Sequence, residues 1–160
     1  MEIERKWLVS VEDIPRNLEF TGSYLIEQAY VSFSPTIRIR RINGGEKHIL
    51  TVKTHPENLE HIGLQREEYE IPLSAAEYSS LLGKTEGNVV HKRRHTFPVG
   101  NGLTGELDFF EGELAGLALL EIEFPDTESA LAFPDPYWVE ADVTYDDRYK
   151  NSALAQAGMP

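Results

Sequence analysis

The chain begins Met1-Glu2-Ile3-Glu4-Arg5-Lys6-Trp7-Leu8-Val9, a stretch that mixes β-branched and aromatic residues with alternating charge. This composition predicts a β-strand. Side chains of a strand alternate between two faces, so one face carries Glu2, Glu4 and Lys6 and the other carries Ile3, Arg5 and Trp7. Two carboxylates about 6–7 Å apart on one face repel each other unless a cation lies nearby. Taken alone, the stretch is compatible with a solvated edge strand or with part of an ion-binding site.

The bulk composition narrows the class of protein. With 160 residues, 41% hydrophobic and 26% charged, the chain is expected to form one soluble domain over residues 1–160. No long apolar run or signal peptide is present, and Cys is absent, so we expect a cytoplasmic protein with no membrane partner and no thiolate metal site. The net charge of −12 argues against a nucleic-acid partner but leaves an anionic ligand open, and both a monomer and a homodimer are possible.

Short alternating segments dominate the rest of the chain. We expect eight or nine strands, mostly antiparallel because short turns such as Asn43-Gly44-Gly45 and Gly100-Asn101-Gly102 join them. A polar loop is expected at residues 55–63 and a last strand at 138–144. Helices are expected from a capping box at Ser74 to Gly83, at 126–132 and at 151–156. The predicted fold is mainly β with a few peripheral helices, and this many strands can close an antiparallel barrel.

Charge is unusually concentrated on one face of nearly every expected strand. Two arrangements fit: a sandwich with charged outer faces, or a closed barrel whose lumen is charged and whose apolar wall faces helices and loops. Fully buried charges must be paired or bound to ions, whereas a water-filled lumen relaxes that requirement, and the pattern favours the barrel. The side chains that share the charged faces after the first strand are Arg38 and Arg40, Thr51 and Lys53, Arg66, Glu68 and Glu70, Lys92 and Arg94, Glu106 and Asp108, Glu121 and Glu123, and Asp142 and Thr144.

A lumen of this kind predicts a particular chemistry. Carboxylate oxygens suit Mg²⁺ or Mn²⁺, whereas Arg and Lys suit phosphate oxygens. Cations alone would indicate an anion-binding pore, and carboxylates alone would indicate a metal store. Both together favour hydrolysis of a phosphate chain that a divalent metal bridges to the protein.

Several motifs occur in an order typical of one known family. They are Glu2-Ile3-Glu4-Arg5-Lys6, Ile37-Arg38-Ile39-Arg40, Leu50-Thr51-Val52-Lys53, Glu68-Tyr69-Glu70-Ile71, Lys92-Arg93-Arg94, Glu106-Leu107-Asp108, Leu120-Glu121-Ile122-Glu123 and Asp142-Val143-Thr144. Each motif is weak alone, but the ordered set resembles the CYTH domain proteins of the triphosphate tunnel metalloenzyme superfamily. The resemblance implies an eight-stranded antiparallel tunnel that binds a triphosphate with Mg²⁺ or Mn²⁺.

The resemblance also implies roles for individual residues. The metal ligands would be Glu2, Glu4, Glu121 and Glu123, and Lys6 would complete a catalytic group with Glu2 and Glu4 by lying near the phosphate or the attacking water. The phosphate oxygens would be held by Arg38, Arg40, Lys53, Lys92 and Arg94. Four further carboxylates would hold a second metal or orient the basic residues, namely Glu68, Glu70, Asp108 and Asp142.

The substrate is expected from the segment Ile26-Glu27-Gln28-Ala29-Tyr30-Val31, which is similar to short bacterial members that act on inorganic tripolyphosphate. Nucleoside or thiamine triphosphate hydrolysis, a class IV-type adenylate cyclase and a non-catalytic polyphosphate-binding module remain alternatives. Tyr30 is expected either to limit substrate length or to pack. The segment Asn151-Ser152-Ala153-Leu154 resembles the family's C-terminal helix, near the tunnel mouth, or is a simple packing helix.

Overall fold

A computed structural model describes residues 1–43, 46–54 and 65–160. The expected loop at 55–63 therefore lies outside the described residues, and so do positions 44 and 45 of the expected turn at 43–45. The strands are β1 (Glu2–Val9), β2 (Gly22–Ser32), β3 (Thr36–Ile42), β4 (Lys47–Thr54), β5 (Gln65–Pro72), β6 (Glu86–Gly100), β7 (Leu103–Phe110), β8 (Ala118–Glu123) and β9 (Ala141–Asp142). The helices are α1 (Ala75–Leu82), α2 (Thr127–Ala132) and α3 (Asn151–Ala157), with 3₁₀ turns η1 (Val11–Asp13), η2 (Gly112–Leu114) and η3 (Asp147–Tyr149).

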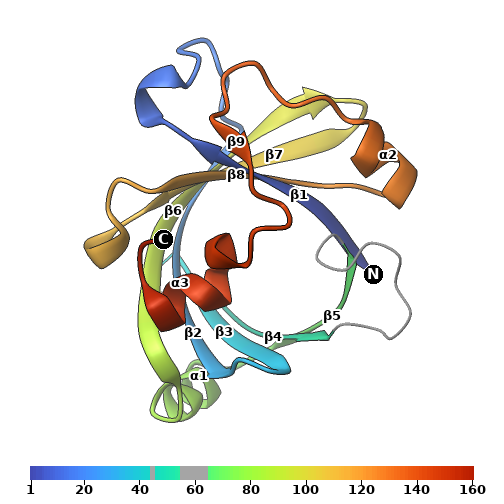
Figure 1. Cartoon of the computed structure of the whole chain (residues 1–160). Coiled ribbons are helices and arrows are strands. Elements are labelled where there is room, and N and C mark those ends of the chain that lie inside the picture. Colours follow the sequence, from blue (N-terminus) through green and yellow to red (C-terminus); the bar gives the residue numbers. More distant parts are fainter. Residues whose placement is uncertain (44–45, 55–64) are drawn as a thin grey trace.

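Strands β1 to β8 form a closed antiparallel barrel. Their order is β5-β4-β3-β2-β6-β7-β8-β1, and a pairing of β5 with β1 completes the ring that Figure 1 shows. The closing pairing joins Glu2 to Arg66 and Ile3 to Gln65. The eight-stranded barrel expected from the sequence is confirmed, and the sandwich is excluded because closure leaves the charged faces inside.

The expected last strand at 138–144 is much shorter in the structure. Only the two residues of β9 pair as a strand, beside Trp7 and Leu8 of β1. The flanking backbone still follows β1, since the Val143 amide donates to the Lys6 carbonyl at 2.9 Å. Thr144 then replaces backbone pairing with its side chain: its Oγ1 accepts from the Lys6 amide at 3.0 Å. This hydrogen bond fixes the C-terminal segment to the strand that carries Glu4 and Lys6.

Helices cover two parts of the outer wall. α2 packs on β1, and the apolar outer faces of β1, β7 and β8 bury Trp7, Leu107 and Leu120 beneath it and the segment that follows. α1 packs on β2, β3 and β4, with Tyr78 against Ile39. The N-terminus of α1 has the expected capping box, in which Ser74 and Glu77 each accept the other's backbone N–H.

The barrel interior divides into a charged end and an apolar end. Inward positions of β1 run from Glu2, Glu4 and Lys6 to Leu8, which packs in the cluster that contains Tyr30, Val90, Phe110, Leu119, Val143 and Leu154. α3 packs against β2 and β6 at this apolar end. The charged lumen expected from the sequence therefore occupies only part of the barrel. Among the described residues, the structure contains no helix of the length and apolarity needed to cross a bilayer.

Candidate active site

A cavity occupies the charged end of the barrel, with about 1050 Å³ of space including its open mouth. This is ample for a small ligand. Its lining is almost entirely polar and comes from the barrel strands and the C-terminal segment: Glu2, Glu4, Lys6, Tyr30, Thr36, Arg38, Arg40, Lys53, Arg66, Glu68, Glu70, Arg94, Glu106, Glu121, Glu123, Val143, Thr144, Asp146, Lys150, Asn151 and Ser152.

The charge of this cavity differs from that of the whole chain. Its lining includes eight carboxylates and seven cations, so it holds seven of the chain's fifteen Lys and Arg residues. The excess of acidic residues that produces the net charge of −12 therefore lies elsewhere. A cavity with this balance can attract both an anion and the cation that accompanies it.

The acidic side of the cavity is built by β1 and β8. Glu4 lies directly opposite Glu123 in the antiparallel register, which brings like charges to within about 4.5–5.5 Å at their Cβ atoms. Within the described part of the chain, neither side chain has a hydrogen bond or ion pair. Burial, together with Glu121 and Glu2, raises the pKa of Glu4, and burial together with Glu2 and Glu4 raises the pKa of Glu123. A bound cation would relieve this repulsion.

Lys6 links the acidic side to the C-terminal segment. Its Nζ lies 3.3 Å from Glu121 Oε1 and donates to the Tyr149 carbonyl at 3.2 Å. Burial alone would lower its pKa, but Glu121 and Glu4 outweigh that effect and raise the pKa of Lys6. The same attraction, with that of Arg94 and Lys92, outweighs burial at Glu121 and holds the pKa of Glu121 well below its usual range. Lys6 is therefore a charged donor at neutral pH.

The basic side of the cavity is built by β3 and β5. Arg38 and Arg66 line it with no hydrogen bond or ion pair to any described residue, and the Nε atom of each is buried without a partner. Arg40 reaches Glu70 Oε1 at 3.2 Å. Burial, and after it the neighbouring cations Arg38 and Arg94, lower the pKa of Arg40 to about 10. Such a group of cations favours a polyanionic ligand.

Lys53 on β4 lies between the two sides. Its Nζ donates to both carboxylate oxygens of Glu2, at 2.9 and 3.2 Å, and lies 3.4 Å from Glu68. Burial and the neighbouring carboxyl group of Glu68 raise the pKa of Glu2 in spite of this cation. Lys53 therefore keeps two carboxylates together in the ligand-free cavity.

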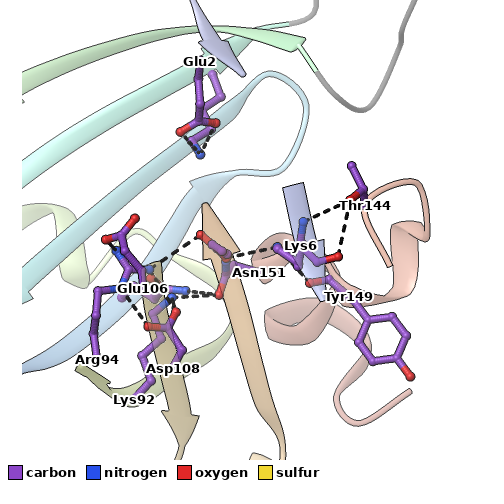
Figure 2. A network of polar contacts seen from close by, with 12 residues as sticks. Glu2, Lys6, Lys92, Arg94, Glu106, Asp108, Thr144, Tyr149 and Asn151 are labelled. Carbon is purple, nitrogen blue, oxygen red and sulfur yellow. Dashed lines mark hydrogen bonds and ion pairs between the residues drawn. The ribbon is translucent and has the colours of Figure 1, made fainter. Parts of the chain in front are cut away.

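Beneath the cavity lies a buried polar network (Figure 2). Asp108 Oδ1 accepts from Arg94 Nε at 2.7 Å and its Oδ2 accepts from Arg94 Nη2 at 2.9 Å, and Lys92 Nζ lies 2.7 Å from the same Oδ2. Asp108 and Lys92 are almost fully buried and do not line the cavity. Burial and the neighbouring Arg94 lower the pKa of Lys92 to about 8, although Asp108 opposes the shift. Of these three residues, only Arg94 lines the cavity.

Asp142 lies outside the cavity, on the opposite face of β1 from Glu4. Its carboxylate accepts from Arg5 Nη2 at 2.6 Å, and the same guanidinium also bonds Asp135 and the carbonyls of Ala130 and Phe133. The structure thus separates Asp142 from the other predicted site residues. Asp142 belongs instead to the group of acceptors around the Arg5 guanidinium, which links β1 to the segment after α2.

Most of the predicted site residues come together in one place. The structure brings to the cavity Glu2, Glu4, Lys6, Arg38, Arg40, Lys53, Glu68, Glu70, Arg94, Glu121 and Glu123. The predicted site omitted Arg66 and Glu106. Both residues lie on the charged faces of their strands, so the alternation of charge would have been enough to predict them. The predicted site also omitted Lys150 and Asn151, for which the strand pattern gave no signal because they follow the last strand.

The carboxylates suit a divalent metal by their chemistry. Hard oxygen donors are what Mg²⁺ and Mn²⁺ prefer, and the facing pair Glu4 and Glu123 makes no ion pair with a described residue. In the same part of the chain, however, no group of three or more His, Asp or Glu side chains is arranged to hold a metal ion. Glu2 and Glu121 instead contact Lys53 and Lys6. Their part in a metal site stays a prediction.

Comparison with known proteins agrees with this geometry. The CYTH domain family model matches residues 1–133. An inorganic triphosphatase of Nitrosomonas europaea is 37% identical over 160 residues, covering 96% of each chain, and an inorganic triphosphatase of Acetivibrio thermocellus is 36% identical over 158 residues, covering 97% of this chain and 93% of that one. The crystal structure of the inorganic triphosphatase NE1496 superposes with a TM-score of 0.67 at 34% identity, covering 97% of this chain and 94% of that one. The barrel, its charged cavity and these similarities along nearly the whole length show that this chain belongs to the CYTH domain family.

Proposed function

We propose that this protein is a triphosphatase that hydrolyses a terminal phosphoanhydride bond of inorganic tripolyphosphate with the help of Mg²⁺ or Mn²⁺. One observation carries the proposal. Arg38 and Arg66, which make no ion pair with a described residue, face the same cavity as Glu4 and Glu123, which also make none there. A phosphate chain and a divalent cation would satisfy both pairs at once.

Different residues of the cavity would have different roles in this reaction. Arg38, Arg40, Arg66 and Arg94 would hold phosphate oxygens and neutralise the charge that develops on them. Lys6 keeps at least one N–H beyond its contacts with Glu121 and Tyr149, and this donor would orient the terminal phosphate or the attacking water. Glu4 and Glu123, with Glu2 and Glu121, would hold the metal. When bound, a divalent cation supplies Lewis acidity at the phosphate oxygens.

The lining of the cavity favours an inorganic chain over a nucleotide. A base needs an aromatic or apolar surface on which to stack, but Tyr30 is only 1% exposed and Val143 is also buried. The remaining described lining residues are polar or charged. The relatives from Nitrosomonas europaea and Acetivibrio thermocellus, both named inorganic triphosphatases, also support this substrate.

A panel of substrates and metals tests the proposal. The purified protein is incubated with tripolyphosphate, ATP and thiamine triphosphate, each with Mg²⁺, Mn²⁺ or EDTA, and released phosphate is measured over a broad pH range. We expect the highest kcat/KM for tripolyphosphate and no turnover in EDTA. If neither Mg²⁺ nor Mn²⁺ supports turnover, the proposal is contradicted. Tight triphosphate binding without turnover would indicate a binding module. Cyclic AMP and pyrophosphate from ATP would indicate a cyclase.

A further inference from the structure

Asn151 at the start of α3 has an amide whose orientation its partners determine. Its Oδ1 accepts from Lys92 Nζ at 3.1 Å (Figure 2) and also from Gln28 Nε2 at 3.0 Å. An ammonium group can only donate, so the atom of Asn151 that faces Lys92 must be the oxygen. The reversed amide would bring its own N–H groups against a cation and is excluded.

The two donors lie behind Asn151 as seen from the cavity. Lys92 and Gln28 are 1% and 0% exposed, and neither lines the cavity, whereas Asn151 does. Because oxygen and nitrogen leave the amide carbon in different directions, binding of the oxygen to the buried side turns the nitrogen towards the cavity. The Nδ2 group has no hydrogen bond to any described residue.

The amide therefore has two N–H donors and, among the described residues, no acceptor for them in the ligand-free cavity. Asn151 shares this cavity with Lys6, Arg94 and Arg38, the donors that the proposed function assigns to phosphate oxygens. A neutral donor among cations suits a phosphate oxygen, because a hydrogen bond to an ionised acceptor is stronger than one between neutral groups. Lys92, which does not line the cavity, would act through Asn151.

We propose that Asn151 is a substrate-binding residue, whose Nδ2 donates to a phosphate oxygen of the bound tripolyphosphate and which Lys92 holds in that orientation. The inference rests on the proposed function and extends it by placing a donor of the C-terminal helix in the substrate site. It also assigns to Lys92 a positioning role in place of direct contact with phosphate.

Binding measurements with three variants test this role. Isothermal titration calorimetry with tripolyphosphate in EDTA measures affinity without turnover, and KM with Mg²⁺ is measured in parallel. Asn151→Asp keeps an oxygen for Lys92 and Gln28 but removes both N–H donors, and we expect its affinity to fall at least tenfold. Asn151→Ser removes the amide without adding charge and should weaken binding at least threefold. Gln28→Met leaves the amide and its bond to Lys92 in place and should change affinity less than threefold.

The variants together distinguish direct contact between Asn151 and phosphate from an effect of added charge and from a purely structural role. Wild-type affinity in Asn151→Asp would overturn the inference, as would weakening in Asn151→Asp alone, because added charge would then explain it. Equal weakening in Gln28→Met and Asn151→Asp would also overturn it in favour of a purely structural role. If Asn151→Asp does not fold by circular dichroism, Asn151→Ser decides the test. A wild-type protein that neither binds nor hydrolyses tripolyphosphate would instead contradict the proposed function, and this inference with it.

Discussion

Asp108 holds the guanidinium of Arg94 by two hydrogen bonds, at 2.7 and 2.9 Å, from a position with no solvent exposure. Arg94 and Lys92 outweigh burial and lower the pKa of Asp108, whereas burial, Glu121 and Glu2 raise the pKa of Glu4. The carboxylates inside the barrel are therefore of two kinds. Asp108 is neutralised by cations of the protein, and Glu4 has acidic neighbours and no ion pair among the described residues.

Asp108→Asn should destabilise the fold. The substitution leaves Lys92 as a buried cation without its ion-pair partner, while Arg94 keeps Glu106 at 2.7 Å. Loss of one partner of a buried ion pair costs roughly 3–5 kcal/mol. The free energy of unfolding in urea measures the effect. Glu113→Gln, at an exposed carboxylate outside the cavity, is the control and should be neutral. A loss below about 1 kcal/mol would mean that Asp108 does not neutralise these cations.

Glu4→Gln should abolish metal-dependent turnover while it preserves the metal-free fold. The change removes a proposed metal ligand and also removes a charge from a repelling pair with Glu123, so metal-free stability should stay equal or increase. Phosphate release and Mn²⁺ binding measure the first effect, and thermal unfolding in EDTA measures the second. An unchanged rate would remove Glu4 from the site.

Arg66→Gln should weaken tripolyphosphate binding by tenfold or more without loss of stability. Arg66 has no ion pair to lose among the described residues, whereas a cation that contacts phosphate contributes about 1.5–3 kcal/mol to binding. Affinity in EDTA and the urea midpoint are the two measurements. Arg16→Gln, at an exposed arginine outside the cavity, is the matched control. Equal affinities of the two variants would exclude Arg66 from substrate binding.

Mn²⁺ affinity should rise with pH through the window just above 4.5 and then level off. The ordinary pKa of Glu is 4.5, and the pKa values of Glu2, Glu4 and Glu123 are raised above it, so a metal must displace protons from them in this window. The folded metal-free protein also binds more protons there than the unfolded chain, so its stability should fall as pH rises through the window.

Calorimetry in buffers of different ionisation enthalpy measures the protons released by Mn²⁺, and unfolding in EDTA measures the stability. Glu4→Gln should release fewer protons. The lowered pKa values of Glu121 and Asp108 act with the opposite sign, and their stabilisation is lost only as pH falls below the ordinary carboxyl range. Mn²⁺ binding without proton release at pH 5 would contradict the prediction.

Asp142→Asn should reduce stability and leave Mn²⁺ affinity unchanged. Asp142 lies outside the cavity, where it accepts from Arg5 at 2.6 Å and from the Thr144 amide at 2.9 Å. We expect a loss of about 1–3 kcal/mol, since Asp135 and two carbonyls still bond Arg5. Thermal unfolding and Mn²⁺ calorimetry separate the two effects. A weakened Mn²⁺ site would return Asp142 to the metal ligands.

The alternation of charge along single strands follows from the amino-acid sequence alone. Glu2, Glu4 and Lys6 are expected to share a face, and all three line the cavity. The two-residue period is a local property of an extended backbone, so it survives whatever the strand later packs against. The capping box at Ser74 is local in the same sense and is likewise predictable.

The alternation along each strand therefore predicts which side chains face inward on most strands, and the ordered motifs indicated the barrel. How far along the barrel each of these side chains lies follows only from the folded arrangement. Lys92 and Asp108 fall below the cavity, Asp142 falls outside it, and Asn151 enters it from a helix after the last strand. These positions depend on strand register and on pairing between residues far apart in the chain, which no period within one strand can specify.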